Sequence, residues 1–172
     1  MSSPEKNLNI LMFNVVNEVL ETMAFMEIME SFASLTPKDI PNLAWSSLLV
    51  NDPVLSEFKL FMSKDLILKI AESVYGLPEE ELTDQILDDT LGEMLNTITG
   101  RFFTKVLPNE QTFALGLPET ASFEEEKEEW AKVPSPYSDS PTIEWNFTLE
   151  GEPLLLIFSG ETIVDWLHTL EL

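Results

Sequence analysis

The sequence predicts an α+β fold in which a largely antiparallel β-sheet packs against two long helices. Two long segments repeat their apolar side chains at helical spacing, and two pairs of short apolar runs joined by turn residues are typical of β-hairpins. The chain has 172 residues, of which 44% are apolar, so it is long enough for one domain with a substantial core. The helical segments are 8–32 and 83–105, and the strand pairs are 43–50 with 54–62 and 142–149 with 153–158.

Each of the remaining elements has its own local signal. The first long helix contains no Gly or Pro that would interrupt it. Ser63 can cap a second, shorter helix that runs to Tyr75 and stops at Gly76. Residues 111–117 alternate only partly but suggest a buried strand, and residues 159–172 can form a short terminal helix.

An acidic segment at about 119–141 differs in character from the rest. It contains a run of Glu residues and is followed by a stretch punctuated by Pro and Ser. We expect a solvated loop or a short acidic helix here. The predicted organisation is therefore a single domain over residues 1–172 that carries this acidic insertion.

The charge balance excludes two classes of partner. The chain has 31 Asp and Glu against 9 Lys and Arg, which gives a formal net charge of −22. Nucleic acid is not expected to bind, because phosphate recognition needs clustered cations. The same argument excludes an anionic membrane surface. A halophilic source would produce a similar balance, and composition does not decide that question.

The counts of Cys and His limit which crosslinks, metal sites and catalytic triads the chain can form. The chain has no Cys and only one His, His168, so we expect no disulfide framework, no zinc-centred hydrolase and no Ser-His-Asp triad. The start lacks the basic and then apolar run of a signal peptide, and no apolar run approaches the roughly 20 residues of a spanning helix. We therefore expect a protein of the cytoplasm.

One polar line on the second long helix is the most specific feature of the sequence. Asp89, Glu93, Asn96 and Gly100 are spaced by four, three and four residues, which places them within roughly 60° of one another, opposite the apolar face. Taken alone, Glu-x-x-Asn is so common that it indicates an ordinary solvated helix face, with the glycines placed for helix–sheet packing, far more often than a site. Gly92 and Gly100 each cost the helix about 1 kcal/mol relative to Ala, which suggests that something approaches the backbone there.

In this context residues 91–100, Leu-Gly-Glu-Met-Leu-Asn-Thr-Ile-Thr-Gly, resemble the signature helix of the CheC/CheX family of chemotaxis phosphatases. The family pattern is Asp or Ser, three residues, Glu, two residues, Asn and a distant Pro. Asp89, Glu93 and Asn96 match its first three positions. Pro118 follows Asn96 after 21 residues, one fewer than the family usually has.

A faint internal repeat refines the resemblance, which covers most of the chain apart from the acidic insertion. It aligns Glu18 with Glu93, but Glu21 with Asn96, so that the amide is missing from the first copy. CheC-type members carry two such motifs and CheX-type members carry one. The single intact motif indicates the CheX-like branch.

The resemblance implies a function, namely hydrolysis of the phosphoaspartate of a CheY-like receiver domain. Asn96 would align the attacking water, and Glu93 would pair with the receiver's Lys. The chain would need no metal or cofactor of its own, because the receiver carries the Mg²⁺. Asp89 would orient Glu93 or border the contact, and the supporting residues are Asp89, Gly92, Gly100 and Pro118.

Two other functions remain alternatives at this point. The chain could be a non-catalytic binding module of a signalling or flagellar switch complex, although such a module has no reason to keep Glu-x-x-Asn. An unrelated hydrolase with two convergent carboxylates ranks last, because Asp89 and Glu93 share one open helix face. Neither the target receiver nor the pathway, chemotaxis or another, can be told from the sequence.

The resemblance also predicts a homodimer. The hairpin at residues 142–158 lies near the chain end, where an edge strand carrying Leu154, Leu156 and Phe158 would need a partner.

Overall fold

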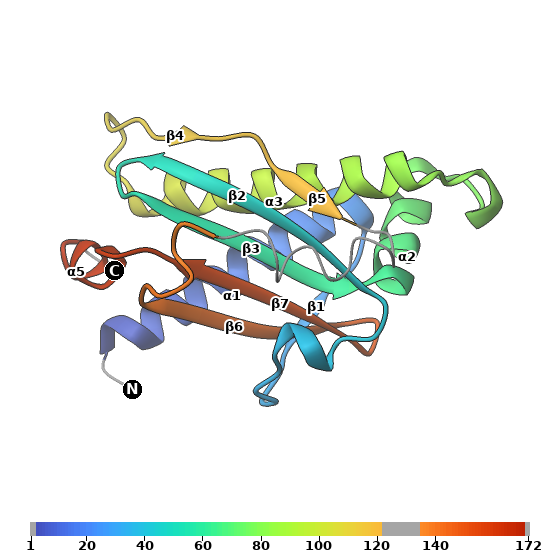
Figure 1. Cartoon of the computed structure of the whole chain (residues 1–172), viewed down its shortest axis with the longest axis horizontal. Helices are drawn as coiled ribbons and strands as arrows, with labels where there is room; N and C mark the ends of the chain where they lie inside the picture. The colour runs from blue at the N-terminus through green and yellow to red at the C-terminus, as the bar shows by residue number, and fades with distance from the viewer. Residues whose placement is uncertain (1–2, 122–134, 171–172) are drawn as a thin grey trace.

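The computed structural model describes residues 3–121 and 135–170, and in this part of the chain a seven-stranded sheet carries α1, α2 and α3 on one face (Figure 1). Every strand pairing is antiparallel. The predicted α+β class, with two long helices against an antiparallel sheet, is confirmed. The helices are α1 (Ser3–Ala24), α2 (Lys64–Tyr75), α3 (Asp84–Val106) and α5 (Ile163–His168), with single 3-10 turns at Pro37–Asp39 and Glu79–Glu81. The strands are β1 (Ile28–Glu30), β2 (Leu43–Asp52), β3 (Ser56–Ser63), β4 (Ala114–Leu115), β5 (Glu119–Ala121), β6 (Thr142–Leu149) and β7 (Glu152–Ser159).

The sheet is built from the two predicted hairpins. β2 pairs with β3, β6 pairs with β7, and β3 pairs with β7, which gives the order β1-β6-β7-β3-β2-β4. β5 also pairs with β2, so that β4 and β5 follow one another along the outer side of this strand. The segment that joins them therefore lies at the sheet edge.

Both faces of the central strands are buried. The main core fills the space between the sheet and the helices, where Phe58 stacks on Phe158 with ring centroids 4.3 Å apart. A smaller cluster lies on the opposite face. β2 and β3 are buried on both faces over most of their length, although each also contains polar residues, among them the buried Ser47 and Glu57. The smaller cluster consists of Ile40, Leu43, Trp45, Phe61, Ala121 and Leu155.

The ends of α2 and α3 follow the local signals of the sequence. The Ser63 hydroxyl accepts a hydrogen bond from the Leu66 N–H at 3.1 Å, and Gly76 ends α2 with a left-handed φ of 64°. Thr83 caps α3 by accepting from the Ile86 N–H at 3.3 Å. No helix among the described residues is long and apolar enough to cross a bilayer.

The first helix ends earlier than its apolar periodicity predicts. It stops at Ala24, and Phe25 follows with a left-handed φ of 56°. The chain then reverses, and the Asn17 side-chain oxygen accepts a hydrogen bond from the Ile28 N–H at 3.0 Å. The prediction of one helix to residue 32 is therefore wrong, because side-chain periodicity does not reveal this reversal.

Two expectations for the later chain are also corrected. The strand predicted at 111–117 shortens to Ala114–Leu115, and neither residue is buried. The first residues of the expected acidic loop, Glu119–Ala121, form β5 instead. Residues 122–134, which hold most of the acidic insertion, lie outside the described residues.

The edge-strand reason for a homodimer is wrong. β7 lies between β6 and β3, and Leu154, Leu156 and Phe158 are fully buried. The edges of the described sheet are β1 at one end and β4 with β5 at the other. The homodimer itself stays a prediction, which would need another surface.

We expect Ser63→Ala to lower the free energy of unfolding by about 1 kcal/mol, because the N–H of Leu66 loses its capping acceptor. Thermal unfolding should show a fall in Tm of roughly 2–4 °C for a domain of this size. Ser34→Ala, at an exposed serine outside the helices and strands, is the control. Equal stability of the two variants would contradict the assignment of Ser63 as a cap.

Candidate functional site

The four residues of the polar line lie on the side of α3 that faces away from the core. Asp89 and Glu93 are exposed, whereas Asn96 and Gly100 are half-buried. The apolar residues of α3 are turned to the sheet and are buried, Met94 and Leu95 among them. Glu93 and Asn96 are three residues apart, so they are neighbours on successive turns of the helix.

A groove of about 430 Å³ lies beside the first half of α3. Its walls come from the end of α2, from α3 and from the segment that leads into β5. Asn96 is not among the described lining residues. It lies on the next turn of α3 after Glu93, which does line the groove. The groove is lined by Tyr75, Asp88, Asp89, Gly92, Glu93, Pro118 and Thr120.

Gly92 allows this groove to form. A Cβ atom added at Gly92 would lie 3.2 Å from Cγ of Pro118 and 3.3 Å from Cγ2 of Thr120. Both distances are tighter than ordinary van der Waals contacts, so the glycine lets α3 pack closely against these two side chains. Pro118, which the sequence pattern places near the signature helix, is therefore in contact range of it.

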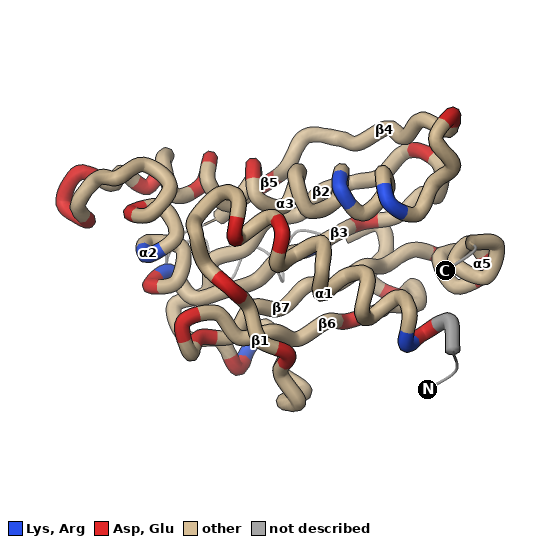
Figure 2. Tube along the Cα trace, turned by 180° about the vertical axis from the view of Figure 1, so that it is seen from behind, with Lys and Arg blue, Asp and Glu red and all other residues tan. Residues whose placement is uncertain are grey.

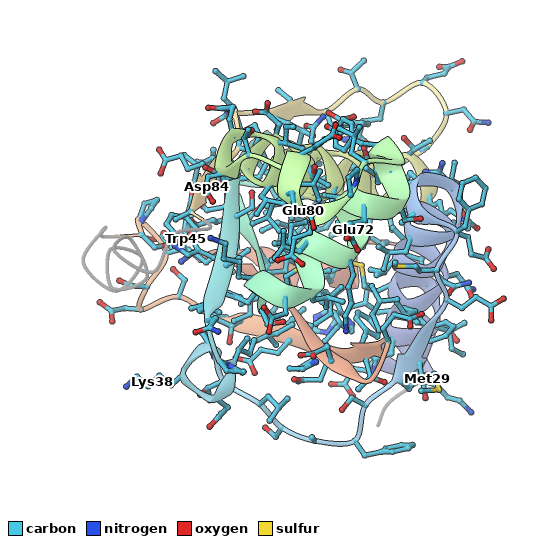
Figure 3. The ribbon with its side chains drawn as sticks, turned by 90° about the vertical axis from the view of Figure 1, so that its right-hand side faces the viewer. Met29, Lys38, Trp45, Glu72, Glu80 and Asp84 are labelled. Atoms are coloured by element: carbon cyan, nitrogen blue, oxygen red, sulfur yellow. The ribbon has the colours of Figure 1, made fainter. Side chains whose placement is uncertain are left out.

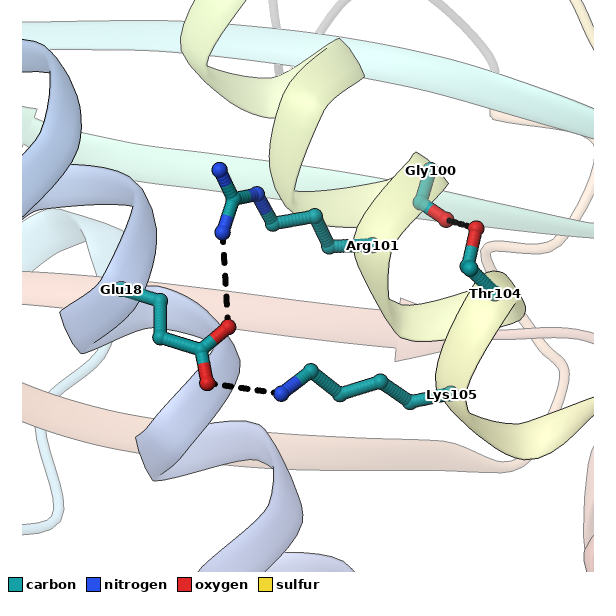
Figure 4. Close-up of polar contacts among 5 residues, drawn as sticks. All are labelled: Glu18, Gly100, Arg101, Thr104 and Lys105. Carbon is teal, nitrogen blue, oxygen red and sulfur yellow. Dashed lines mark hydrogen bonds and ion pairs between the residues drawn. The ribbon is translucent and has the colours of Figure 1, made fainter.

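Gly100 behaves differently. A Cβ atom added there would meet no described atom within 4 Å. Its carbonyl accepts a hydrogen bond from Thr104 Oγ1 at 2.8 Å (Figure 4). The expectation that something approaches the backbone at both glycines holds within the described chain for Gly92 and not for Gly100.

Hydrogen bonds within α3 hold the two acidic side chains separately. Gln85 Nε2 donates to Asp89 Oδ1 at 2.8 Å, and Thr97 Oγ1 donates weakly to Glu93 Oε1 at 3.4 Å. Asp89 is thus held by Gln85, and the hydrogen bond that restrains Glu93 comes from Thr97. The Asn96 amide makes no hydrogen bond to any residue in the described part of the chain, so both its donor and its acceptor are available to a ligand.

The electrostatic character of the groove is negative. Asp88, Asp89 and Glu93 contribute carboxylates, and none of the lining residues in the described part of the chain is Lys or Arg. The turn Glu79–Glu81 that precedes α3 is also acidic, as Glu80 shows in Figure 3, whereas Asp84 is paired with Lys64. In the described residues, no group of three His, Asp or Glu side chains could hold a metal ion. The groove therefore favours a positively charged group of a partner.

The glutamates of the degraded copy of the motif on α1 lie at the surface, and one of them is tied to α3. Glu18 Oε1 lies 2.7 Å from Lys105 Nζ, and Glu18 Oε2 lies 3.4 Å from Arg101 Nη1 (Figure 4). The hydrogen bond from Lys105 is the main cause that lowers the pKa of Glu18 below its ordinary value of 4.5. Glu18 thus joins α1 to α3, while Glu21 is exposed.

Three lining residues were not identified from the sequence. Tyr75 and Thr120 enter the groove only because α2 and β5 pack against α3, whereas Asp88 lies on α3 itself, beside Asp89. Tyr75 was visible as the end of a helix, but nothing in the sequence pattern says which helix it faces. The contribution of α2 to the site is therefore a result of the structure.

The family comparison agrees with the signature helix. Residues 50–135, half of the chain, match the family model described as chemotaxis phosphatase CheX. The chain belongs to the CheX family.

Solved structures of related proteins share this fold. CheX from Desulfovibrio desulfuricans is 15% identical, with a TM-score of 0.66 over 88% of this chain and 97% of the other. CheX in a CheX–CheY–BeF3–Mg²⁺ complex from Borrelia burgdorferi is 16% identical, with a TM-score of 0.64 over 87% and 95%. Thermotoga maritima FliY is 14% identical, with a TM-score of 0.65 over 98% and 95%. No curated protein sequence gives a significant match. At these identities the structural matches establish the fold alone.

The two glycines of α3 predict opposite responses to alanine. We expect Gly100→Ala to raise the free energy of unfolding by about 0.5–1 kcal/mol, because alanine is the better helix former and the added methyl meets no described atom. Gly92→Ala has the same helical gain but must push Pro118 and Thr120 outward. Urea unfolding should therefore rank Gly92→Ala below Gly100→Ala, and the reverse order would contradict the close packing at Gly92.

The ion pairs of Glu18 predict a dependence of stability on pH. Because its folded pKa is lowered, its contribution is present above the ordinary value of 4.5 and is lost as the pH falls through the lowered value. The carboxylate is 42% exposed, so solvent screening limits the contribution to about 0.5 kcal/mol. Glu18→Gln should destabilise the protein by that amount at pH 7 and have no effect once Glu18 is protonated.

Glu21→Gln is the matched control, because it removes the same charge from α1 without breaking an ion pair among the described residues. Equal unfolding free energies of the two variants across this pH range would show that the Glu18 ion pairs contribute nothing.

Proposed function

We propose that this chain hydrolyses the phosphoaspartate of a CheY-type receiver domain. One observation carries the proposal: Glu93 and Asn96 stand on neighbouring turns of α3, on its outward side, in a chain of the CheX family. The complex from Borrelia burgdorferi contains CheY with BeF3 and Mg²⁺. That complex supports a partner of the same class for this chain.

Asn96 is the residue that would align the water. Its amide can accept a hydrogen bond from the water and donate another, which fixes the water oxygen in line with the scissile bond. The water oxygen bonds to phosphorus, the bond from phosphorus to the aspartyl oxygen breaks, and a water proton leaves with the inorganic phosphate. The products are phosphate and the free aspartate of the receiver.

Glu93 would hold the two proteins in register. An ionised carboxylate at the border of the groove can pair with the Lys that a receiver carries near its phosphoryl group. The hydroxyl of Thr97 restrains this carboxylate on α3. A charge pair of this kind contributes to association and orientation.

The remaining site residues would act through position. Gly92 and Pro118 fix the wall of the groove next to Glu93, and Asp89 lines the groove one helical turn before Glu93. No metal of the chain's own enters the proposal, and Mg²⁺ would be supplied by the receiver.

A non-catalytic binding module is the second candidate. The match to FliY shows that this fold also occurs in a protein with a different name. The alternative requires binding to a partner without loss of phosphate, and the retained Asn96 weighs against it.

We expect Asn96→Ala to slow dephosphorylation of a CheY-type receiver at least 100-fold, because the water loses its aligning amide. Timing phosphate release from the phosphorylated receiver at saturating enzyme measures this turnover. The change in unfolding free energy should stay within about 0.5 kcal/mol, because Asn96 makes no hydrogen bond in the described chain. A wild-type rate for Asn96→Ala would overturn the proposal.

Two further variants separate binding from turnover. Glu93→Ala should raise KM more than it lowers kcat, since it removes a pair across the interface. Glu21→Ala, at the degraded copy of the motif, should match the wild type in both constants. A wild-type chain that binds receivers but releases no phosphate would favour the binding-module alternative.

A further inference from the structure

Tyr75 is the one aromatic side chain among the residues that line the groove. It is the last residue of α2, and the left-handed Gly76 turns the chain away directly after it. Its side chain is 46% exposed, and it is not among the side chains packed against the main core, unlike its neighbour Val74. Tyr75 therefore presents a ring to solvent next to Glu93.

Such a ring has a clear use in recognition. Half-exposed tyrosines in grooves are frequent centres of binding energy, because they bury a large area and lose little conformational entropy. Beside carboxylates, the face of the ring also attracts the stem and charge of a Lys or Arg side chain.

We propose, on the basis of the proposed function, that Tyr75 is a contact residue that selects which receiver domain this chain accepts. The occupant is a Lys or Arg of the receiver surface, outside the phosphorylation site. Its stem lies on the Tyr75 ring and its charge faces the carboxylates of the groove. Glu93 pairs with the Lys near the phosphoryl group, which receivers share. Tyr75 contacts a surface Lys or Arg of the receiver, a position at which receivers can differ.

The test measures binding to a CheY-type receiver held active with BeF3 and Mg²⁺, by isothermal titration calorimetry with the full chain. We expect Tyr75→Ala to raise Kd about tenfold, Tyr75→Phe to stay within twofold, and Tyr75→Lys to weaken binding more than Tyr75→Ala. At saturation, kcat of Tyr75→Ala should stay within twofold of the wild type. Phe32→Ala removes an aromatic side chain that is 98% exposed outside the groove, and its Kd should be unchanged.

The outcomes distinguish the two proposals. Equal Kd for wild type, Tyr75→Ala and Tyr75→Lys overturns the role of Tyr75 and leaves the phosphatase proposal standing. Tight binding that depends on Tyr75, without phosphate release, overturns the phosphatase proposal alone. Absence of binding to every activated receiver of a panel overturns both. A loss of kcat equal to the loss of affinity would also overturn a pure contact role.

Discussion

The close approach of α3 to Pro118 and Thr120 is the contact on which the site depends. It exists because position 92 has no side chain, so the helix can pack directly against a segment that is itself tied to the edge of β2. The hydrogen bonds of β5 to β2 hold one wall, and the helix supplies the other. The outward side of α3 is thereby set beside a groove instead of standing on an open surface, and Glu93 borders that groove.

The faint sequence repeat aligns a glutamate of α1 with a glutamate of α3, and the two side chains have different surroundings. On α1 the glutamate of the repeat, Glu18, faces α3 and engages Arg101 and Lys105, two of the nine basic residues of the chain. On α3 the corresponding glutamate, Glu93, faces away from the core. The carboxylate of Glu18 therefore joins α1 to α3, whereas the carboxylate of Glu93 is exposed at the surface. Seen from the helix side, acidic residues are distributed over the helices and basic residues interrupt them at only a few places (Figure 2).

The parts of this structure that could be predicted are those with a local cause. Ser63, Gly76 and Thr83 act through their own side chains or backbone within one turn, and the structure has the helix ends that they predict. The end of α1 depends on a reversal at Phe25 and on Asn17 reaching Ile28, which no periodicity contains. The groove could not be predicted from the sequence for the same reason: helical spacing places Glu93 and Asn96 together on α3, but only tertiary packing brings Tyr75 into the groove that Glu93 lines.

Because the chain has a large excess of negative charge, its choice of partner depends on short-range contacts at the groove. A chain of net charge −22 repels other acidic proteins at distances comparable with the Debye length, about 8 Å at physiological salt. Productive binding then requires attraction that acts at contact. In the proposed complex, the aromatic ring of Tyr75 and the carboxylate of Glu93 would provide two such contacts of different chemistry, one apolar and one ionic. A partner that presents a cation with an apolar stem satisfies both, whereas one that presents an acidic surface gains neither and meets the full repulsion. In the proposed interaction, specificity would therefore come from the repulsion of acidic partners as well as from attraction to a cationic side chain.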